Sequence, residues 1–373
     1  MADAKELIDA LGDKGVTFYT GVPDSLLSKF SACIMQQPEL KHIIATNEGN
    51  AVGLALGEYL ATGCPGVVYM QNSGLGNVVN PLTSLADPAV YAIPMFLVIG
   101  WRGEPGVHDE PQHVKQGRIT LAQLDVLGVP YFVCDESSDV RILVAELWQK
   151  MFQNHGPVAL VVRKGALKGE WAVNKKSLQS SIKREEALDC LLKALPESAF
   201  YVATTGKTGR ELFELRERDH HCQRDFLTVG GMGHASSIAL TIALRHPQKT
   251  VVCLDGDGAA LMHLGAMATI AAEQPKNFIH VLLNNAAHES VGGQPTIAGE
   301  LDFEKLSLAL GYSSYISVDK REDFQRLSSV LTNENKGPLL LEIRVLQGAR
   351  KELGRPNKTP IQNKESVMNY LKG

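Results

Sequence analysis

The stretch from Gly256 to Asn285, GDGAALMHLGAMATIAAEQPKNFIHVLLNN, determines the expected fold. Its Gly-Asp-Gly triplet follows the apolar run VVCLD, and its Asn-Asn pair ends a second apolar run. The 25 residues between the triplet and the pair (259 to 283) are enough for one helix and one strand. The pattern therefore predicts a strand, a helix and a second strand, with polar side chains following each strand.

The residue types in this stretch favour a site for a diphosphate held through a metal ion. Glycines allow the backbone to approach a ligand closely, and the N-terminus of a helix favours anions. Asp257 would then lie beside a phosphate, and its carboxylate would repel that phosphate unless a cation lay between them. Mg²⁺, which prefers oxygen ligands, fits this position, and Asn285 can add an amide oxygen. The triplet taken alone is equally consistent with a purely structural turn.

The composition is that of an ordinary globular protein. The chain has 373 residues, 44% of them hydrophobic, and this length allows two α/β domains. A net charge of −4 gives no indication of nucleic-acid binding. The first residues, MADAKELIDALGDKG, are polar and amphipathic, unlike a signal peptide, and no apolar run approaches the roughly 20 residues of a membrane span. We therefore expect a soluble, cytoplasmic protein that binds neither nucleic acid nor a membrane.

Strand and helix patterns alternate twice along the chain, which predicts parallel sheets covered on both faces. The expected strands lie near residues 16–20, 42–45, 66–70, 95–99, 131–134, 158–162, 199–203, 250–254, 278–284 and 339–344. Expected helices of the second half include 207–218, 233–245 and 302–310. The predicted fold class is α/β, with two doubly wound domains. We expect a first domain at 1–165, a polar linker at 166–183 and a second domain at 184–373.

The spacing of the Gly-Asp-Gly and Asn-Asn motifs resembles the signature of thiamine diphosphate-dependent 2-oxo acid decarboxylases. The resemblance extends over nearly the whole chain through eight blocks: GVPDSLLSKF, NEGNAVGLALGEYLATG, MQNSGLGNVVNPLTSL, WRGEPGVHDEPQHVKQGRIT, TTGKTGRELFELRE, VGGMGHASSIAL, NNAAHESVGGQPT and GRPNKTPIQNK. It implies a thiamine diphosphate-binding fold made of a pyrimidine-binding and a diphosphate-binding domain. The chain is too short for the central third domain of most family members.

The resemblance also implies which residues bind Mg²⁺ and the cofactor's diphosphate. Asp257 and Asn285 would be metal ligands. The backbone carbonyl of Ala287 would be a third ligand, provided that φ of this residue is negative. Gly256 and Gly258 would line the diphosphate.

Three residues would act on the rest of the cofactor. Glu48, in TNEGNAVGLALG, lies where a strand is expected to pass into a helix, and the resemblance implies that its carboxyl group hydrogen-bonds the aminopyrimidine ring. Met232, in VGGMGHASSIAL, would hold the cofactor in a bent shape, and the Gly230 carbonyl would orient its amino group. The alternatives are a carboxylate favoured by a helix N-terminus for Glu48 and core packing for Met232.

Asp24 and His113 are candidates for proton transfer. Asp24, in GVPDSLLS, is next to an expected helix start, where Asp is a common N-cap. The resemblance instead implies an acidic residue that faces the substrate carboxylate and protonates the product after carbon dioxide leaves. His113 lies in WRGEPGVHDEPQHVKQGR, which lacks periodicity and is interpreted as a functional loop. A solvated loop residue is the alternative for His113.

The implied reaction is the Mg²⁺-dependent decarboxylation of 3-phosphonopyruvate to 2-phosphonoacetaldehyde and carbon dioxide, a step of phosphonate biosynthesis. The substrate would carry a carboxylate and a phosphonate dianion, so its site needs cations or N–H donors. The candidates for substrate binding are Arg102, Lys207, His288 and Arg350.

Other functions remain open at this point. Sulfopyruvate differs from phosphonopyruvate by one charge, and known sulfopyruvate decarboxylases often divide the two domains between polypeptides, whereas this chain contains both. This fusion favours the phosphonate substrate modestly. A carboligation role and a non-decarboxylating, cofactor-binding regulator are further alternatives, although a regulator would be free to lose Glu48.

The resemblance also implies an assembly. In the family, the first domain of one chain and the second domain of another form each active site. We therefore expect a homo-oligomer, at least a dimer with shared active sites.

Overall fold

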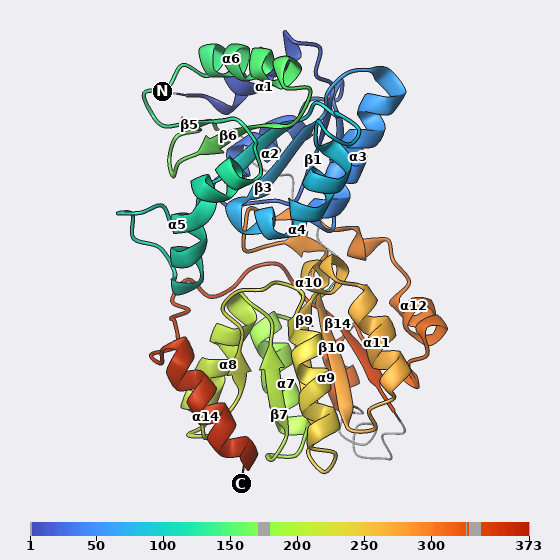
Figure 1. Ribbon diagram of the computed structural model, residues 1–373. Coiled ribbons are helices and arrows are strands. Elements are labelled where there is room, and N and C mark those ends of the chain that lie inside the picture. The colour runs from blue at the N-terminus through green and yellow to red at the C-terminus, as the bar shows by residue number, and fades with distance from the viewer. Residues whose placement is uncertain (1, 171–179, 326, 328–336, 373) are drawn as a thin grey trace. The chain divides into compact units, whose positions relative to one another are not determined.

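The chain divides into two compact units (Figure 1). The computed structural model describes residues 2–170, 180–325, 327 and 337–372. The first unit comprises Met1–Lys175 and Ser290–Gln294, and the second comprises Lys176–Glu289 and Pro295–Gly373. Residues 171–179 of the expected linker lie outside the described residues. On either side of them, Ala166 belongs to the core of the first unit and Ile182 to the core of the second.

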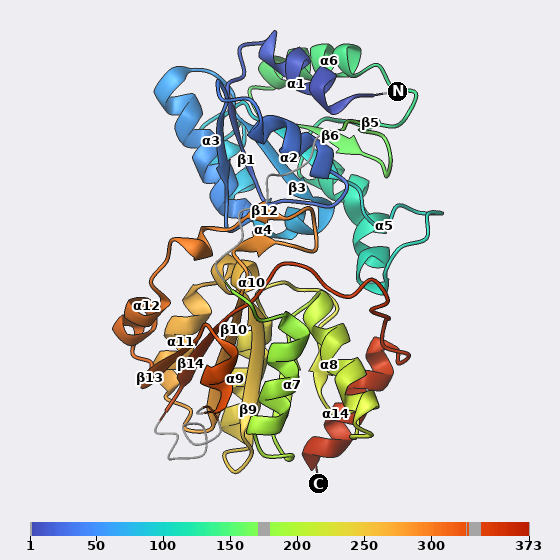
Figure 2. The same cartoon turned by 180° about the vertical axis from the view of Figure 1, so that it is seen from behind.

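The first unit is built on a six-stranded parallel sheet with the order β2-β1-β3-β4-β6-β5. Its strands are β1 (Phe18–Gly21), β2 (Lys41–Ile44), β3 (Val67–Gln71), β4 (Phe96–Gly100), β5 (Tyr131–Cys134) and β6 (Val158–Val162). Its helices are α1 (Ala4–Gly12), α2 (Ser28–Met35), α3 (Glu48–Thr62), α4 (Leu75–Pro81), α5 (Pro111–Val126) and α6 (Val140–Gln153), with the short segments η1 (Asn72–Gly74) and η2 (Leu82–Ala86). Residues of α1, α2 and α6 pack against one face of the sheet, and residues of α3, α4 and α5 pack against the other (Figures 1 and 2).

The second unit repeats this plan with a parallel sheet of order β13-β14-β10-β9-β7-β8. Its strands are β7 (Phe200–Ala203), β8 (Phe226–Leu227), β9 (Val251–Gly256), β10 (Phe278–Asn284), β13 (Ser314–Val318) and β14 (Leu339–Arg344). The short strand β11 (Ala287–His288) pairs with β12 (Gln294–Pro295), whose two residues are assigned one to each unit. Its helices are α7 (Arg184–Ala194), α8 (Lys207–Arg218), α9 (Ala235–Arg245), α10 (Asp257–Met262), α11 (Gly265–Glu273), α12 (Phe303–Leu310) and α14 (Pro360–Lys372), with η3 (Ile297–Gly299) and η4 (Arg321–Asp323). Residues of α7 and α8 cover one face, and residues of α9, α10, α11 and α14 cover the other.

The strand order places a reversal of chain direction in each sheet. In the first unit β1 leads to β2 on one side, and the chain then returns to β3 on the other side. In the second unit β7 leads to β8, and the chain then returns to β9. Loops at the carboxyl ends of the strands separate at such a reversal, and ligands of doubly wound folds bind there. The two reversals therefore mark where each unit would hold a ligand.

The predicted fold class is confirmed, and so are the ten predicted strands, each within two residues at either end. The central strands were recognisable because both of their faces are buried, as in β4 and β6, which gives continuous apolar runs. Two edge strands were not predicted. β13 is partly exposed, and β8 has only two residues, so neither produces an apolar run.

Two details of the sequence-based prediction are wrong. The helix expected after the Gly-Asp-Gly triplet begins at Asp257 itself and is interrupted, because His263 has φ −129° and ψ 53° between α10 and α11. The segment interpreted as a functional loop around His113 is helical from Pro111 onward. Proline at the first helical position accounts for this start, since its fixed φ suits a helix and its missing N–H is not needed there.

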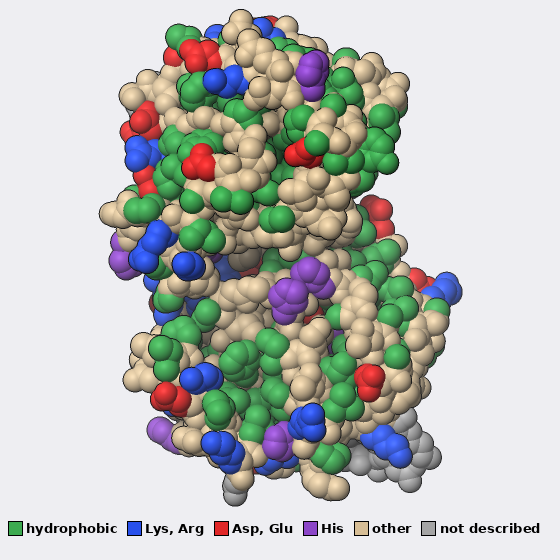
Figure 3. All heavy atoms as spheres, in the orientation of Figure 1, with side chains coloured by type: hydrophobic (Ala, Val, Ile, Leu, Met, Phe, Trp, Pro, Cys, Tyr) green, Lys and Arg blue, Asp and Glu red, His purple; other side chains and the backbone are tan. Residues whose placement is uncertain are grey.

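The surface carries side chains of both signs of charge on the face displayed in Figure 3. This mixture agrees with the small net charge of −4. Within the described part of the chain, no helix has the length and apolar character needed to cross a membrane.

Gly117 provides a test of how α5 is packed. A Cβ atom at this position would lie 1.8 Å from the carbonyl oxygen of Gly103, which is a backbone atom of the preceding loop. We expect Gly117→Ala to lower the free energy of unfolding by about 1–3 kcal/mol through overpacking, although alanine is the better helix former. Urea unfolding followed by circular dichroism would measure the change.

The matched control is Gly12→Ala at the end of α1, where a Cβ atom would meet no atom within 4 Å. We expect this variant to be as stable as the wild type or slightly more stable. Equal effects of the two substitutions would contradict the proposed packing of α5.

Candidate active site

Asp24 lies just after β1, at the reversal point of the first sheet. Its side chain is fully buried, and one carboxyl oxygen accepts a hydrogen bond of 3.0 Å from the N–H of Leu26. The other oxygen, Oδ1, has no hydrogen-bond partner among the described residues. Burial raises the pKa of Asp24 to about 6. Since α2 begins only at Ser28, Asp24 does not cap this helix, and its carboxyl group has the properties of a proton carrier.

Glu48 is the first residue of α3 and is 5% exposed. Asn47 caps the helix by accepting the N–H of Gly49 at 2.7 Å, so Glu48 is not needed for this purpose. The carboxylate of Glu48 accepts a hydrogen bond of 2.6 Å from the amide of Asn77 on α4. A Cβ atom on Gly74 would lie 2.6 Å from Oε1 of Glu48, so a larger residue at this position would displace the Glu48 side chain. The side chain is therefore fixed beside the segment that follows β3.

Arg102 follows β4 and lies close to Asp24. Its guanidinium donates from Nε to Asp109 at 2.7 Å and from Nη1 to the hydroxyl of Ser25 at 3.0 Å. The positive charge of Arg102 lowers the pKa of Asp24, although burial has the larger effect. Burial also acts to raise the pKa of Asp109, but the hydrogen bonds from Arg102 and from backbone N–H groups hold it below its usual range. Asp109 thus keeps a cation beside Asp24.

His113 lies in the first turn of α5 and is partly buried. Burial lowers the pKa of its imidazole, and the charge of Arg102 lowers it further. The ring is therefore neutral at pH 7. The structure thus brings Arg102 near both proton-transfer candidates of the first unit.

Asp257 is placed at the carboxyl end of β9, as the first residue of α10. It is almost fully buried, and burial raises its pKa to about 6. The hydroxyl of Thr296 donates to its carboxylate, and the nearby backbone N–H groups of Gly258 and Ala287 lower its pKa. None of these donors is a cation. A bound cation would stabilise the ionised form of this buried carboxyl group.

The Asn-Asn pair shapes the turn after β10. The side-chain oxygen of Asn284 accepts the N–H of Ala286, and that of Asn285 accepts the N–H of Ala287, each at 3.0 Å. These two consecutive Asx turns place Ala286 in the left-handed region, with φ 52°. Ala287 is not among the residues with positive φ, so its predicted role as a carbonyl ligand meets the stated condition. The turn brings three predicted ligands, Asp257, Asn285 and Ala287, together.

Both amide groups of this pair are oriented by carboxylates, one of them buried and the other largely buried. The nitrogen of Asn284 donates to Glu342 at 2.7 Å, and the nitrogen of Asn285 donates to Glu289 at 2.9 Å. Because only the nitrogen can donate, each side-chain oxygen is directed to the turn. An amide oxygen has two lone pairs, so that of Asn285 can accept the N–H of Ala287 and also bind a metal.

Thr204 was not predicted as a site residue, and the start of α8 was predicted only through Lys207, as a substrate-binding residue. Thr204 follows β7, which pairs with β9 in a register that places Ala203 opposite Leu254. Within the part of the chain that the structure describes, its hydroxyl group is buried without a hydrogen-bond partner. Gly206, with φ 107°, precedes α8, and no side chain caps this helix. The signal was present in the sequence, since TTGK joins a strand to a helix next to the Gly-Asp-Gly turn.

The space beside the turns that follow β7 and β9 suits an anion. A Cβ atom at Gly206 or at Gly256 would meet no atom within 4 Å. The unpaired hydroxyl of Thr204 and the uncapped N–H groups of α8 are donors that still require acceptors. The carboxyl ends of β7 and β9 can therefore hold a diphosphate.

Met232 and His288 lie beside the Gly-Asp-Gly turn. Met232 stands between Gly231, with φ 64°, and Gly233, with φ 86°, and Gly230 belongs to the same segment. A Cβ atom on Gly258 would lie 3.3 Å from Cε of Met232 and 3.1 Å from the ring of His288. Burial lowers the pKa of His288 to about 4, so its imidazole is neutral at pH 7. These side chains form an apolar and uncharged border of the turn.

The remaining predicted cations already have carboxylate partners. Lys207, the first residue of α8, donates to Glu289 at 2.8 Å. Arg350 donates to Glu185 at 2.8 Å and also pairs with Glu214, in exposed ion pairs. Exposed pairs of this kind add little to stability and do not form a built anion site.

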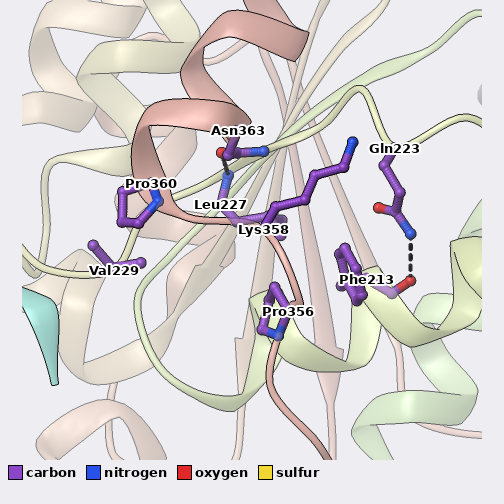
Figure 4. A pocket seen from close by; sticks show the side chains of 8 residues that line it. All are labelled: Phe213, Gln223, Leu227, Val229, Pro356, Lys358, Pro360 and Asn363. Carbon is purple, nitrogen blue, oxygen red and sulfur yellow. Dashed lines mark hydrogen bonds between the residues drawn. The ribbon is translucent and has the colours of Figure 1, made fainter.

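Two other features of the second unit lie apart from these residues. Cys253, Asp255 and His280 form a fully buried cluster, in which Nδ1 of His280 lies 3.0 Å from the hydroxyl of Tyr312. Its mixed sulfur, nitrogen and oxygen atoms do not match the preference of Mg²⁺ for oxygen. A cavity of about 30 Å³ is lined by Phe213, Gln223, Leu227, Val229, Pro356, Lys358, Pro360 and Asn363 (Figure 4). It has room for water but not for a substrate.

The chain belongs to the thiamine pyrophosphate enzymes, whose cofactor is also called thiamine diphosphate. The model of their N-terminal TPP binding domain matches residues 1–125, and that of their C-terminal TPP binding domain matches residues 205–343. A phosphonopyruvate decarboxylase of Streptomyces viridochromogenes is 35% identical over 97% of this chain and 93% of its own. One of Streptomyces hygroscopicus is 34% identical over 96% and 92%. A sulfopyruvate decarboxylase of Methanosarcina acetivorans is 30% identical over 85% of each chain.

The residues of the second unit fit the cofactor of this family together with a divalent metal. The buried carboxylate of Asp257 has no cation among its hydrogen-bond donors, and the side-chain oxygen of Asn285 is directed to the same turn. The unpaired hydroxyl of Thr204 and the open start of α8 match the need of a diphosphate for donors.

The buried carboxyl group of Asp24 predicts a stability cost at neutral pH. Its folded pKa of about 6 exceeds the unfolded value of about 3.9, so the folded state binds more protons between these values. Stability therefore falls as the pH rises from about 4 to about 6 and stays lower above that range. Asp24→Asn removes this titration, and we expect its advantage over the wild type to grow by up to about 3 kcal/mol between pH 4 and pH 8.

Urea unfolding at several pH values would measure this difference. The control is Asp125→Asn, which alters an exposed carboxyl group on α5. A difference between Asp24→Asn and the wild type that is independent of pH would contradict a raised pKa of Asp24.

Proposed function

We propose that this enzyme decarboxylates 3-phosphonopyruvate to 2-phosphonoacetaldehyde and carbon dioxide, with thiamine diphosphate and Mg²⁺, as a step of phosphonate biosynthesis. The observation that carries the proposal is the likeness to two phosphonopyruvate decarboxylases at 34–35% identity over at least 96% of the chain. The site supports it, because Glu48, Asp257 and Asn285 occur at the carboxyl ends of the strands, where the family's cofactor would bind.

Sulfopyruvate is the alternative substrate. The sulfopyruvate decarboxylase of Methanosarcina acetivorans covers 85% of this chain and is itself covered to 85%, so it too combines both domains in one chain. The fusion of the two domains therefore does not favour phosphonopyruvate, contrary to the expectation from the sequence. What favours phosphonopyruvate is the higher identity and the longer match to the two Streptomyces enzymes.

Thiamine diphosphate supplies a carbon nucleophile and an electron sink for decarboxylation. Glu48 would exchange a proton with the pyrimidine ring, and its bond from Asn77 holds the carboxylate ready for this. Asp24 would deliver a proton to the product carbon. Its pKa of about 6 allows it to be protonated in a useful fraction of molecules near neutral pH and to be reprotonated from solvent. His113, neutral at pH 7, would relay protons to it.

Arg102 is the best supported candidate for substrate binding in the first unit. Its guanidinium lies near Asp24 and is held by Asp109 in a fixed orientation. A planar guanidinium suits the recognition of a carboxylate or a phosphonate oxygen pair. Lys207, His288 and Arg350 have weaker support. Arg102 is also paired with a carboxylate, so pairing alone does not rank the cations, but Arg350 forms only exposed pairs and His288 is neutral. Lys207 is held by Glu289.

Asp257, Asn285 and the carbonyl of Ala287 would hold the Mg²⁺ ion, which would neutralise both Asp257 and the diphosphate. Thr204 and the N-terminus of α8 would donate to the diphosphate, and Gly256 and Gly258 would leave room for it. Met232 would contact the apolar part of the cofactor, beside the Gly230 carbonyl.

We also propose that the enzyme assembles as a homo-oligomer, at least a dimer. Support comes from α3, which is apolar on nearly all sides yet exposes one side that contains Gly53, Gly57 and Leu60. Cβ atoms at Gly53 and Gly57 would meet no atom within 4 Å, and Leu60 is 70% exposed. A helix of this kind is normally covered, and a helix of a second copy fits the small side chains. The cytoplasmic location expected from the sequence stays a prediction.

Release of carbon dioxide from phosphonopyruvate, sulfopyruvate and pyruvate at equal concentration tests the substrate. With Mg²⁺ and thiamine diphosphate present, we expect a clear preference for phosphonopyruvate and loss of turnover when EDTA removes the metal. Glu48→Gln should lower kcat by roughly 10²–10⁴-fold, because it removes an acid–base group.

The control for this substitution is Glu146→Gln, on the exposed side of α6, which should keep wild-type turnover. Faster turnover of sulfopyruvate would keep the cofactor chemistry but replace the substrate. Absence of turnover with all three substrates, while the cofactor binds, would favour carboligation or a regulatory role.

The proposed assembly predicts that Gly57→Arg separates the subunits. The new side chain would stand on the exposed side of α3 and would lose hydration if a second copy covered it. Light scattering after size-exclusion chromatography should show a dimer or larger for the wild type and a monomer for the variant, with loss of turnover. A wild-type monomer that retains activity would contradict the proposal.

A further inference from the structure

The carboxylate of Glu289 accepts three hydrogen bonds in the second unit. The donors are Nη1 of Arg184 at 2.9 Å, Nζ of Lys207 at 2.8 Å and Nδ2 of Asn285 at 2.9 Å. They come from three different elements, namely the start of α7, the start of α8 and the turn after β10. Two of these donors are cations, which favours the ionised form of this carboxyl group. Glu289 therefore joins three elements at the carboxyl end of the sheet.

Glu289 is part of a neutral group of four charges. Arg184 also donates two hydrogen bonds to Glu211, from Nε at 2.7 Å and from Nη2 at 2.9 Å. Arg184, Glu211 and Glu289 are largely buried, and Lys207 is 35% exposed. Two cations thus face two carboxylates, and every charge has a hydrogen-bonded partner. Such a group resists rearrangement, because moving one member would leave another buried and unpaired.

The hydrogen bond between Asn285 and Glu289 determines which atom of the Asn285 amide faces Glu289. The amide nitrogen of Asn285 donates to Glu289. The amide oxygen therefore points away from Glu289, and it accepts the N–H of Ala287. A flipped amide would place its oxygen against the carboxylate of Glu289, and the two acceptors would repel each other. Glu289 therefore permits only one of the two orientations of this amide.

We propose that Glu289 is a positioning residue that fixes the side-chain oxygen of Asn285 for the metal ion. The inference rests on the proposed function, since it assigns a role toward the metal of that site. It also gives Lys207 a different role from the predicted one. Lys207 and Arg184 hold the carboxylate of Glu289 in place from two sides, so Lys207 supports the metal site instead of binding the substrate.

The neighbouring Asn284 also donates to a carboxylate, but the partners of that carboxylate differ from those of Glu289. Asn284 donates to Glu342 at 2.7 Å, and Glu342 also accepts the hydroxyl hydrogen of Tyr315 at 2.6 Å. No lysine or arginine hydrogen-bonds Glu342 in the described residues; the nearest ion-pair atom is Nε of Arg344 at 3.8 Å. The four-charge group thus occurs at the asparagine that is the predicted metal ligand.

The experiment measures the Mg²⁺ concentration that gives half-maximal binding of thiamine diphosphate, by isothermal titration calorimetry on the assembled protein. Glu289→Ala should raise this concentration by roughly 10–100-fold, the usual effect of removing a partner of a metal ligand. The double variant Glu289→Ala/Lys207→Ala removes the released ammonium group as well and should show the same rise. At saturating Mg²⁺, both variants should regain cofactor binding.

The control is Asp225→Asn, which weakens another buried ion pair of the same unit, with Nε of Arg216 at 2.8 Å. It should leave the Mg²⁺ requirement unchanged, so that a general loss of stability is separated from a loss of positioning. A wild-type Mg²⁺ requirement in folded Glu289→Ala and in the double variant would overturn the inference. A wild-type protein that binds no thiamine diphosphate at any Mg²⁺ concentration would overturn the proposed function itself.

Discussion

The parallel pairing of β9 with β7 on one side and β10 on the other is the constraint on which the second unit depends. Parallel strands end at the same edge, so the pairing brings Thr204, Asp257 and Asn285 together although they are distant in the sequence. The reversal of strand order between β7 and β9 opens space between the first two turns. The same logic in the first unit places Asp24 after β1 and Glu48 at the start of α3. The order and pairing of the strands thus determine where the candidate site residues lie.

The carboxyl groups of Asp24, Asp257 and Glu289 differ in their properties because their neighbours differ. Asp24 has one unpaired oxygen and a raised pKa, which suit proton transfer. Asp257 is surrounded by N–H and O–H donors but has no cation bonded to it, which suits a metal ligand. For Glu289, burial acts to raise the pKa, but Arg184 and Lys207 together hold it below its usual value, which suits a permanently charged anchor. Carboxyl groups can take these different roles because desolvation, hydrogen bonds and nearby charges each shift the pKa separately.

The sequence was sufficient for ten strands, for the helices α8, α9 and α12 and for the family, but not for the contacts that complete the site. Apolar runs report burial on both faces, which is why the ten predicted strands are present. They say nothing about side-chain partners, and Arg184 reaches Glu289 across 105 positions of the chain. Thr204 was missed although TTGK joins a strand to a helix, because only the structure shows that its buried hydroxyl group lacks a partner among the described residues. The break at His263 was missed for a related reason, since the apolar pattern continues through it.

The backbone conformation of Ala286 limits which residue types can occupy this position, although its side chain has no proposed role in the reaction. Its φ of 52° costs an alanine about 1–2 kcal/mol, and the two Asx turns on either side hold the backbone there. Glycine would adopt this conformation freely and asparagine would tolerate it, whereas valine, isoleucine and threonine would be excluded by their branched Cβ atoms. Natural variation at this position is therefore limited by backbone geometry, and a search for allowed replacements that considered only side-chain contacts would misjudge it.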